Sequence, residues 1–111
     1  MRRAAAGILI AGLVVAAGAL TIRAAVAAGV HTVLIENMQF SPSMLVVRRG
    51  DRVVWINKDL FPHTVTANGN AFDSHTIQSN ASWTYRAQRA GKFNYRCSLH
   101  PTMQGMLSVI Q

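Results

Sequence analysis

The stretch KFNYRCSLHPTMQG, residues 92–105, decides both the fold and the chemistry of this chain of 111 residues. Its first half alternates strictly: Phe93, Tyr95 and Cys97 share one parity, and charged or polar residues occupy the other. Side chains two residues apart in a β-strand point to the same face, so the alternation predicts a strand over residues 92–97. Its apolar face must lie in the core, which places the thiol of Cys97 inside the protein at the end of the strand.

The same period of two recurs along the rest of the chain from residue 30 onward. Further strands are predicted at residues 30–36, 44–47, 52–57, 64–67, 82–87 and 106–110. Clusters of Gly, Asn, Ser and Pro separate these segments and are typical of turns. Seven short strands at this spacing predict a single all-β domain at residues 29–111, an antiparallel sandwich or barrel.

The composition excludes several other classes of protein. A chain of 111 residues is one small domain, too short for an enzyme with a separate substrate domain. Two Trp and repeated Val and Ile runs exclude intrinsic disorder, and the single cysteine excludes a disulfide framework. The net charge is +7, of which the three arginines of residues 1–28 contribute +3, so residues 29–111 carry +4.

Residues 1–28 have the layout of a secretory signal peptide. A basic Met1-Arg2-Arg3 start precedes an uncharged run over residues 4–20, and small residues at 24–28 offer a cleavage site. An uncleaved membrane anchor is the alternative, because the run is only just long enough to span a bilayer. We expect cleavage and export, to the periplasm or an equivalent space. A free thiol in that oxidising space must be buried or bound.

Three potential metal ligands follow one another at intervals of three residues: Cys97, His100 and Met103. Thiolate and thioether are soft ligands, imidazole suits copper, and two His, one Cys and a weak axial Met are typical of a blue-copper electron-transfer site. The second histidine must come from elsewhere in the chain. His63, in the segment FPHTV at residues 61–65, is the candidate.

Two other chemistries use the same types of residue. A structural zinc site favours further thiolates or a second Cys-x-x-Cys pair, and the chain has only one cysteine. A Cys/His nucleophilic enzyme needs a substrate cleft, for which 83 residues at 29–111 leave little room, and it gives no role to Met103. We therefore expect a copper protein that is not an enzyme.

The chain resembles the cupredoxins, the small type 1 copper proteins, and is most similar to the amicyanin/plastocyanin group. The matching segments are FSP at 40–42, VRRGDRVVWIN at 47–57, FPHTV at 61–65, FDS at 72–74 and YRCSLHPTMQG at 95–105. The resemblance implies a Greek-key β-sandwich and one copper ion per chain. It also implies that His63, Cys97 and His100 are equatorial ligands, that Met103 is the axial ligand, and that Asn57 has a structural role.

The chain departs from this family at two positions. Thr64 stands where plastocyanin-like proteins often have an Asn that ties the ligand loops together, and Asn80 replaces a turn Gly while tolerating a left-handed backbone. We expect the site to survive both changes. Of the remaining histidines, we expect His31 to be a solvated strand residue and His75 to be a surface loop residue. The other methionines are expected to fill the core, namely Met38, Met44 and Met106.

These observations predict an exported carrier of single electrons. We expect His100 to be the electron port, with Leu99, Pro101 and Phe61 as an apolar docking patch, and redox partner proteins with acidic surfaces. Outward parity in adjacent strands predicts that Arg86 and Arg96 share one sheet face.

The alternative to an electron carrier is a copper-binding protein for sequestration or delivery. Export argues against nucleic acid as a partner; we expect a monomer, without membrane contact unless the leader is retained.

Overall fold

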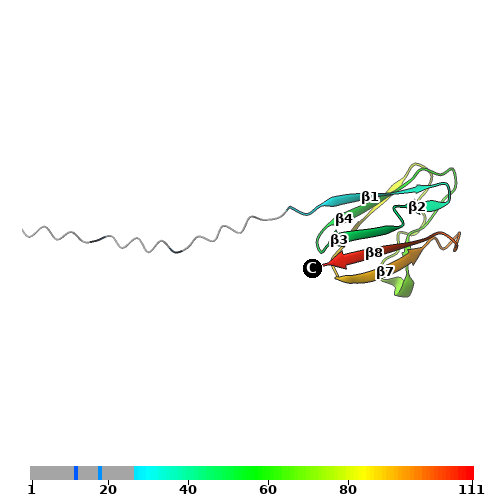
Figure 1. Ribbon diagram of the computed structural model, residues 1–111. Coiled ribbons are helices and arrows are strands. Elements are labelled where there is room, and N and C mark those ends of the chain that lie inside the picture. Colours follow the sequence, from blue (N-terminus) through cyan, green and yellow to red (C-terminus); the bar gives the residue numbers. More distant parts are fainter. Residues whose placement is uncertain (1–11, 13–17, 19–26) are drawn as a thin grey trace, which may run out of the picture.

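The computed structural model describes residues 27–111 together with Gly12 and Gly18 (Figure 1). All of the described strands lie within residues 30–110. The predicted signal peptide at residues 1–28 lies almost wholly outside the described residues. Within the described part of the chain, no helix is long and apolar enough to cross a membrane.

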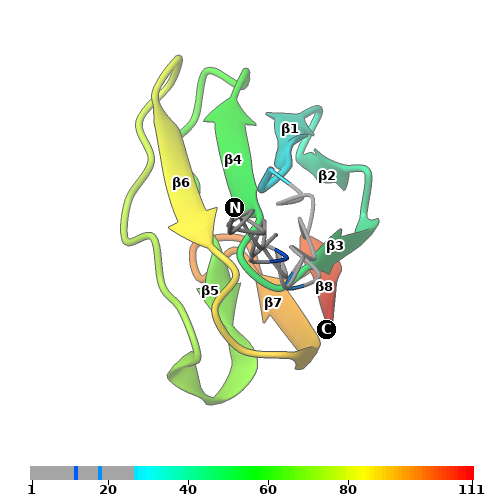
Figure 2. The same ribbon diagram turned by 90° about the vertical axis from the view of Figure 1, so that its left-hand side faces the viewer.

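Eight strands form two four-stranded sheets that pack face to face (Figure 2). The first sheet contains, in spatial order, β2 (Gln39–Ser41), β1 (Val30–Glu36), β4 (Arg52–Asn57) and β6 (Ser82–Arg86). The second contains β3 (Met44–Arg48), β8 (Gln104–Ile110), β7 (Gly91–Arg96) and β5 (Thr66–Ala67), and a short 3-10 turn at Asn68–Asn70 follows β5. The all-β sandwich predicted from the alternation is confirmed.

The core lies between the two sheets and is built from the inward parity of each strand. Trp55 of β4 is fully buried, and its ring lies 5.6 Å from that of Tyr95 on the opposite sheet. Leu107 of β8 and Cys97, directly after β7, are also fully buried. Burial of each large apolar side chain contributes about 1.5–3 kcal/mol. The sandwich therefore holds the end of β7, and with it Cys97, in a fixed place.

The structure corrects the expected strand pairing. Pairing is not purely antiparallel, because β1 runs parallel to β4 and β3 runs parallel to β8. Strand β2 was not predicted, since its three residues bury only Phe40. Strand β5 is shorter than predicted because the amides of Thr64 and Val65 donate to side chains, Cys97 Sγ and Ser74 Oγ, instead of to a neighbouring strand.

The prediction that Arg86 and Arg96 share a sheet face is wrong. Arg86 ends β6 in the first sheet, and Arg96 ends β7 in the second. The chain crosses between the sheets at residues 87–90, so strands that follow one another in sequence are not neighbours in space. The two arginines also lie at opposite ends of the sandwich, since Arg86 pairs with Arg52 at the start of β4 and Arg96 precedes Cys97.

Two of the three methionines expected in the core are exposed. Met44 is the first residue of β3 and is 66% exposed, and Met38 lies in the β1–β2 turn with φ of 58° and is 38% exposed.

Two other predictions are confirmed: His75 is an exposed loop residue, and Asn80 adopts the left-handed conformation with φ of 63°. His31 is a strand residue, but it is only partly solvated because its ring bonds Asp51.

Asp51 closes the end of the sandwich where β1, β3 and β4 meet. Its carboxylate accepts hydrogen bonds from the Gly29 and Arg48 amides at 2.8 and 2.9 Å and contacts His31 Nε2 at 2.9 Å. The Arg48 amide, His31 and the Gly29 amide together lower the pKa of Asp51 to about 2, against 3.8 ordinarily. Asp51 is therefore ionised at neutral pH, and its carboxylate links the start of β1 to the turn between β3 and β4.

We predict that Asp51→Asn lowers the melting temperature at pH 7 and that the difference from wild type disappears on acidification. A depressed folded-state pKa means that the carboxylate stabilises the fold above pH 3.8 and that this contribution is lost as the pH falls to about 2. Thermal unfolding between pH 2 and pH 7 measures it. Glu36→Gln, at an exposed carboxylate at the end of β1, is the control at pH 7. A difference that is constant from pH 7 to pH 2 would contradict this account.

Candidate metal centre

Cys97, His63 and His100 converge at one end of the sandwich. Their ligand atoms all lie within 4.8 Å of one another. The Cys97 Sγ atom is 3.7 Å from His63 Nδ1 and 3.8 Å from His100 Nδ1. Cys97 and His63 are fully buried, and His100 is half-buried. His63 thus meets two residues that lie 34 and 37 positions further along the chain, as the sequence analysis expected.

The loop from Cys97 to Met103 is closed by its own backbone. The Cys97 amide donates to the Met103 carbonyl at 3.1 Å, and the Met103 amide donates to the His100 carbonyl at 2.9 Å. Strand β7 ends just before Cys97 and β8 begins just after Met103, so both ends of the loop are anchored in the second sheet. The Met103 side chain is 97% buried and belongs to the core cluster that also contains Cys97.

His63 is fixed by a separate loop that leaves β4. Its amide and carbonyl both bond Ile77, at 3.1 and 2.7 Å. The Asn57 side-chain amide, at the end of β4, donates to the carbonyls of Phe61 and Ile77 at 2.8 and 3.0 Å. Asn57 therefore sets the path of the chain on both sides of His63, which agrees with the structural role expected for it.

Thr64 joins the two ligand loops. Its amide donates to Cys97 Sγ at 3.3 Å, and its Oγ1 accepts the Ser98 amide at 2.8 Å. Because Asp73 accepts the hydroxyl proton of Thr66, the hydroxyl of Thr64 in turn donates to Thr66 Oγ1 at 2.9 Å. The shorter side chain thus still ties the loops together, and its amide donor is placed to stabilise a thiolate bound to a metal.

Asp59 was not identified as part of the site from the sequence. Its Oδ2 lies 2.8 Å from His63 Nε2. Burial raises the pKa of Asp59, but hydrogen bonds from the Met38 amide, His63 and the Asn37 amide outweigh that effect, and the pKa lies below its usual value. A carboxylate only accepts, so Nε2–H donates to it, and Nδ1 is the ring nitrogen that faces Cys97 Sγ. The signal in the sequence was an acid four residues before the ligand histidine.

The donor set fits one copper ion. Metal–nitrogen and metal–sulfur bonds of about 2.0 and 2.3 Å, 120° apart, separate the donor atoms by about 3.7 Å, close to the two sulfur–nitrogen distances here. One thiolate and two imidazoles in a trigonal arrangement are typical of type 1 copper. Two of the three donors, Cys97 and His63, are buried and held by hydrogen bonds, so the chain has the features of a small copper-binding β-sandwich.

Comparison with known proteins establishes the family. A family model for the cupredoxin-like domain matches residues 8–109, and the chain belongs to the cupredoxin-like family. It is 31% identical to amicyanin of Paracoccus denitrificans over 91 residues, which cover 78% of this chain and 70% of that protein. It is 28% identical to plastocyanin of Tetradesmus obliquus over 109 residues, covering 86% of this chain and 70% of that protein.

Solved structures agree with this assignment. A copper(I) form of an amicyanin variant superposes with a TM-score of 0.67 at 28% identity, covering 76% of this chain and 85% of that one. A copper-containing nitrite reductase from Thermus scotoductus superposes with a TM-score of 0.69 at 22% identity, over 73% of this chain and 22% of that chain. The second likeness shows a shared fold alone.

We predict that Asp59→Asn weakens copper(II) binding about 10- to 100-fold, the usual effect of losing the partner that orients a ligand histidine. The amide would replace the charged acceptor of the His63 Nε2–H group with a weaker, neutral one. Competition with a chelator of known affinity measures the change. Glu36→Gln removes a carboxylate that is also near this end of the sandwich but bonds no ligand residue, and should bind copper as wild type does. Equal affinities for Asp59→Asn and Glu36→Gln would remove Asp59 from the site.

Proposed function

We propose that this chain is an exported blue-copper protein that carries single electrons between redox partners. The proposed equatorial ligands are His63, Cys97 and His100, with Met103 as the axial ligand. The observation that carries the proposal is a buried thiol and two imidazoles that two hydrogen-bonded loops hold at 3.7–3.8 Å from the sulfur. The relatives named amicyanin and plastocyanin support the same function.

Bound copper would supply the redox chemistry by alternating between Cu(I) and Cu(II), taking up one electron and releasing it again. The chain supplies a site that need not rearrange between these states. Asn57 and Ile77 hold His63, and the Thr64 amide holds the sulfur. Such a site transforms no substrate, and the chain accordingly acts as a carrier and not as an enzyme.

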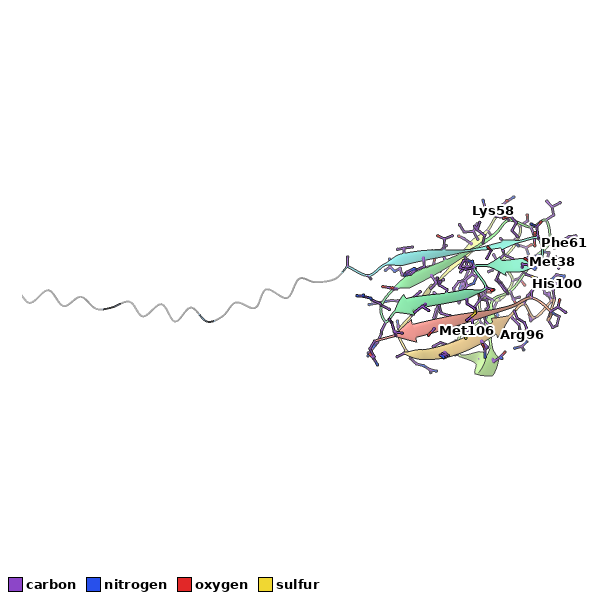
Figure 3. All side chains as sticks on the ribbon, viewed as in Figure 1. Met38, Lys58, Phe61, Arg96, His100 and Met106 are labelled. Atoms are coloured by element: carbon purple, nitrogen blue, oxygen red, sulfur yellow. The ribbon has the colours of Figure 1, made fainter. Side chains whose placement is uncertain are left out.

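The half-buried ring of His100 is the proposed port for electrons. Around it the surface is apolar: Leu99 is 50% exposed and Phe61 is 60% exposed. Leu60, which the sequence analysis did not include, is 88% exposed. Figure 3 shows His100 and Phe61 at the same end of the domain, far from the start of β1. A small apolar patch of this kind suits weak, quickly broken encounters between redox proteins.

Charge plays a smaller part in this docking patch than the sequence suggested. Lys58 and Arg96 are the basic side chains at the ligand end of the described domain, and Glu36, Asp59 and Asp73 lie in the same half. The proposed partners are therefore redox proteins that meet an apolar surface. A monomer in the periplasm, released from its signal peptide at residues 1–28, is the form that we propose for the working protein.

We predict that the copper-loaded protein is blue and is reduced and reoxidised reversibly by one electron. The colour would come from charge transfer between the Cys97 thiolate and Cu(II). Visible spectra of wild type and of Cys97→Ser measure it. The serine variant should lose the intense band, because a hydroxyl group cannot replace the thiolate as the donor in this charge transfer. A band that survives in Cys97→Ser would refute the ligand assignment. Ready transfer of copper to an acceptor, without reversible reduction, would instead favour copper delivery.

We further predict that Met103→Gln keeps copper but shifts the reduction potential and the spectrum. An axial bond is long and weak, so it tunes the potential more than it holds the metal. Met106→Gln is the matched control, because Met106 lies within β8 opposite Met44 and Asn94, on the parity away from buried Leu107. Voltammetry and visible spectra of both variants decide between them. A large shift in Met106→Gln with none in Met103→Gln would reassign the axial ligand.

A further inference from the structure

The positive charge of the domain is concentrated at the end opposite the ligand cluster. We call this end the arginine pole; its exposed basic side chains are Arg48, Arg49, Arg52, Arg86, Arg89 and Lys92. The acidic side chain described at this end is that of Asp51, which is buried and bonded internally. The pole therefore carries a net charge of +5, and the rest of residues 29–111 carries −1.

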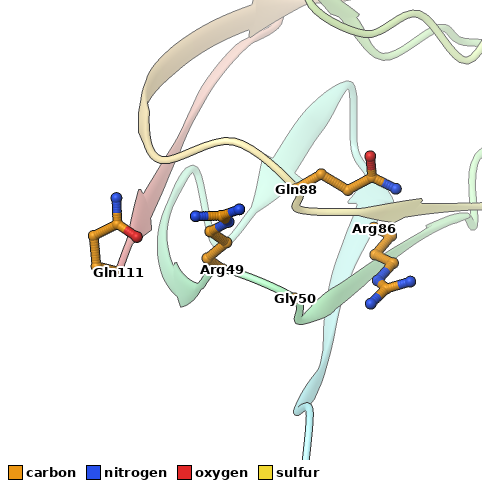
Figure 4. A pocket seen from close by; sticks show the side chains of 5 residues that line it. All are labelled: Arg49, Gly50, Arg86, Gln88 and Gln111. Carbon is orange, nitrogen blue, oxygen red and sulfur yellow. The ribbon is translucent and has the colours of Figure 1, made fainter.

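The basic side chains of the arginine pole are not neutralised by the protein. The ion pairs found within the described residues all involve a histidine, and none involves an arginine or a lysine. Arg49 and Arg86 flank the Gly50 turn and line an open hollow of about 540 Å³ with Gln88 and Gln111 (Figure 4). Charges of one sign around a hollow that no acidic side chain lines favour an anionic ligand or surface.

Exposed aliphatic side chains lie among these arginines. Val30 is 66% exposed and pairs with Arg52 across β1 and β4. Ile110 is 48% exposed and pairs with Arg48 across β8 and β3. Apolar side chains beside cationic ones are typical of surfaces that rest on a charged bilayer, because the former can enter the headgroup region while the latter meet the phosphates.

The chain also enters the domain at the arginine pole. Residues 27–29 lead directly into β1, whose first residue Val30 stands beside Arg52 (Figure 1). The preceding sequence holds the uncharged run of residues 4–20, which meets the membrane during export. The arginine pole is thus the end of the domain that is nearest the bilayer when the chain emerges.

A redox partner fits the arginine pole less well. The seven residues of β1 span about 20 Å between this pole and the ligand end. A partner bound at the pole would stand that far from His100, which lies at the opposite end together with the apolar patch. The charge is thus separated from the surface through which electrons would pass.

We propose that the arginine pole binds the surface of a membrane that contains anionic phospholipids. Bound in this way, the domain would stand on its basic end and present His100 and the surrounding apolar patch to partners in solution. The proposal rests on the export proposed above, but it requires neither bound copper nor a retained leader, so vesicle binding and copper binding can fail independently.

The test is binding of residues 29–111 to lipid vesicles, measured by co-sedimentation. This fragment contains all eight strands and the whole described core, so it folds without the leader. We expect it to bind phosphatidylcholine vesicles that contain 30% phosphatidylglycerol at low salt, and not to bind pure phosphatidylcholine vesicles. Binding should weaken as salt rises, because the charges are exposed.

Two double variants with the same loss of charge locate the binding surface. Arg49→Gln/Arg86→Gln should weaken binding about 30-fold, the effect expected from two basic residues near an anionic surface. Lys58→Gln/Arg96→Gln, at the ligand end, should change it less than about threefold. Equal weakening by both pairs would show a response to net charge alone and would overturn the proposal. Failure to bind the anionic vesicles would overturn the proposal as well. Binding to polyglutamate, a model acidic protein, would not rescue it, because the proposed ligand is a membrane surface.

Discussion

The sulfur of Cys97 is the point on which the two ligand loops depend. It lies at the end of β7, fully buried, and it accepts the amide of Thr64 from the other loop at 3.3 Å. Burial alone would destabilise a thiolate, because a charge removed from water needs a compensating partner. The amide supplies part of that compensation. A cation bound between the sulfur and the two imidazoles, which lie 3.7 and 3.8 Å from it, would supply the rest.

The surrounding structure keeps this arrangement rigid. Each loop is fixed independently, one by the hydrogen bond between Cys97 and the Met103 carbonyl and the other by Asn57 and Ile77. The hydroxyl chain from Thr64 through Thr66 to Asp73 then joins the loop of His63 to the second sheet. A metal that changes oxidation state in such a frame finds the same donors before and after, which is what rapid electron transfer requires.

The sequence predicted those features that depend on local periodicity and spacing. Strands β1 and β4 have the predicted bounds, and the ligand cluster combines His63 with the Cys97–Met103 loop as expected. The pairing order of the strands was not predictable, because alternation shows which face of a strand is buried and not which strand lies beside it. The same gap produced the wrong placement of Arg86 and Arg96. The contact between Asp59 and His63 was not predicted, because it depends on the path of the folded loop that brings the carboxylate to the ring.

The central claim is that copper binds one sulfur and two imidazole nitrogens in a frame that does not rearrange on reduction. X-ray absorption fine structure at the copper edge, recorded on the oxidised and the reduced protein, tests it most directly. The account predicts one short sulfur shell and two nitrogen ligands in both states, with little change in their distances. A first shell without the short sulfur, or one that loses a nitrogen ligand on reduction at neutral pH, would contradict it.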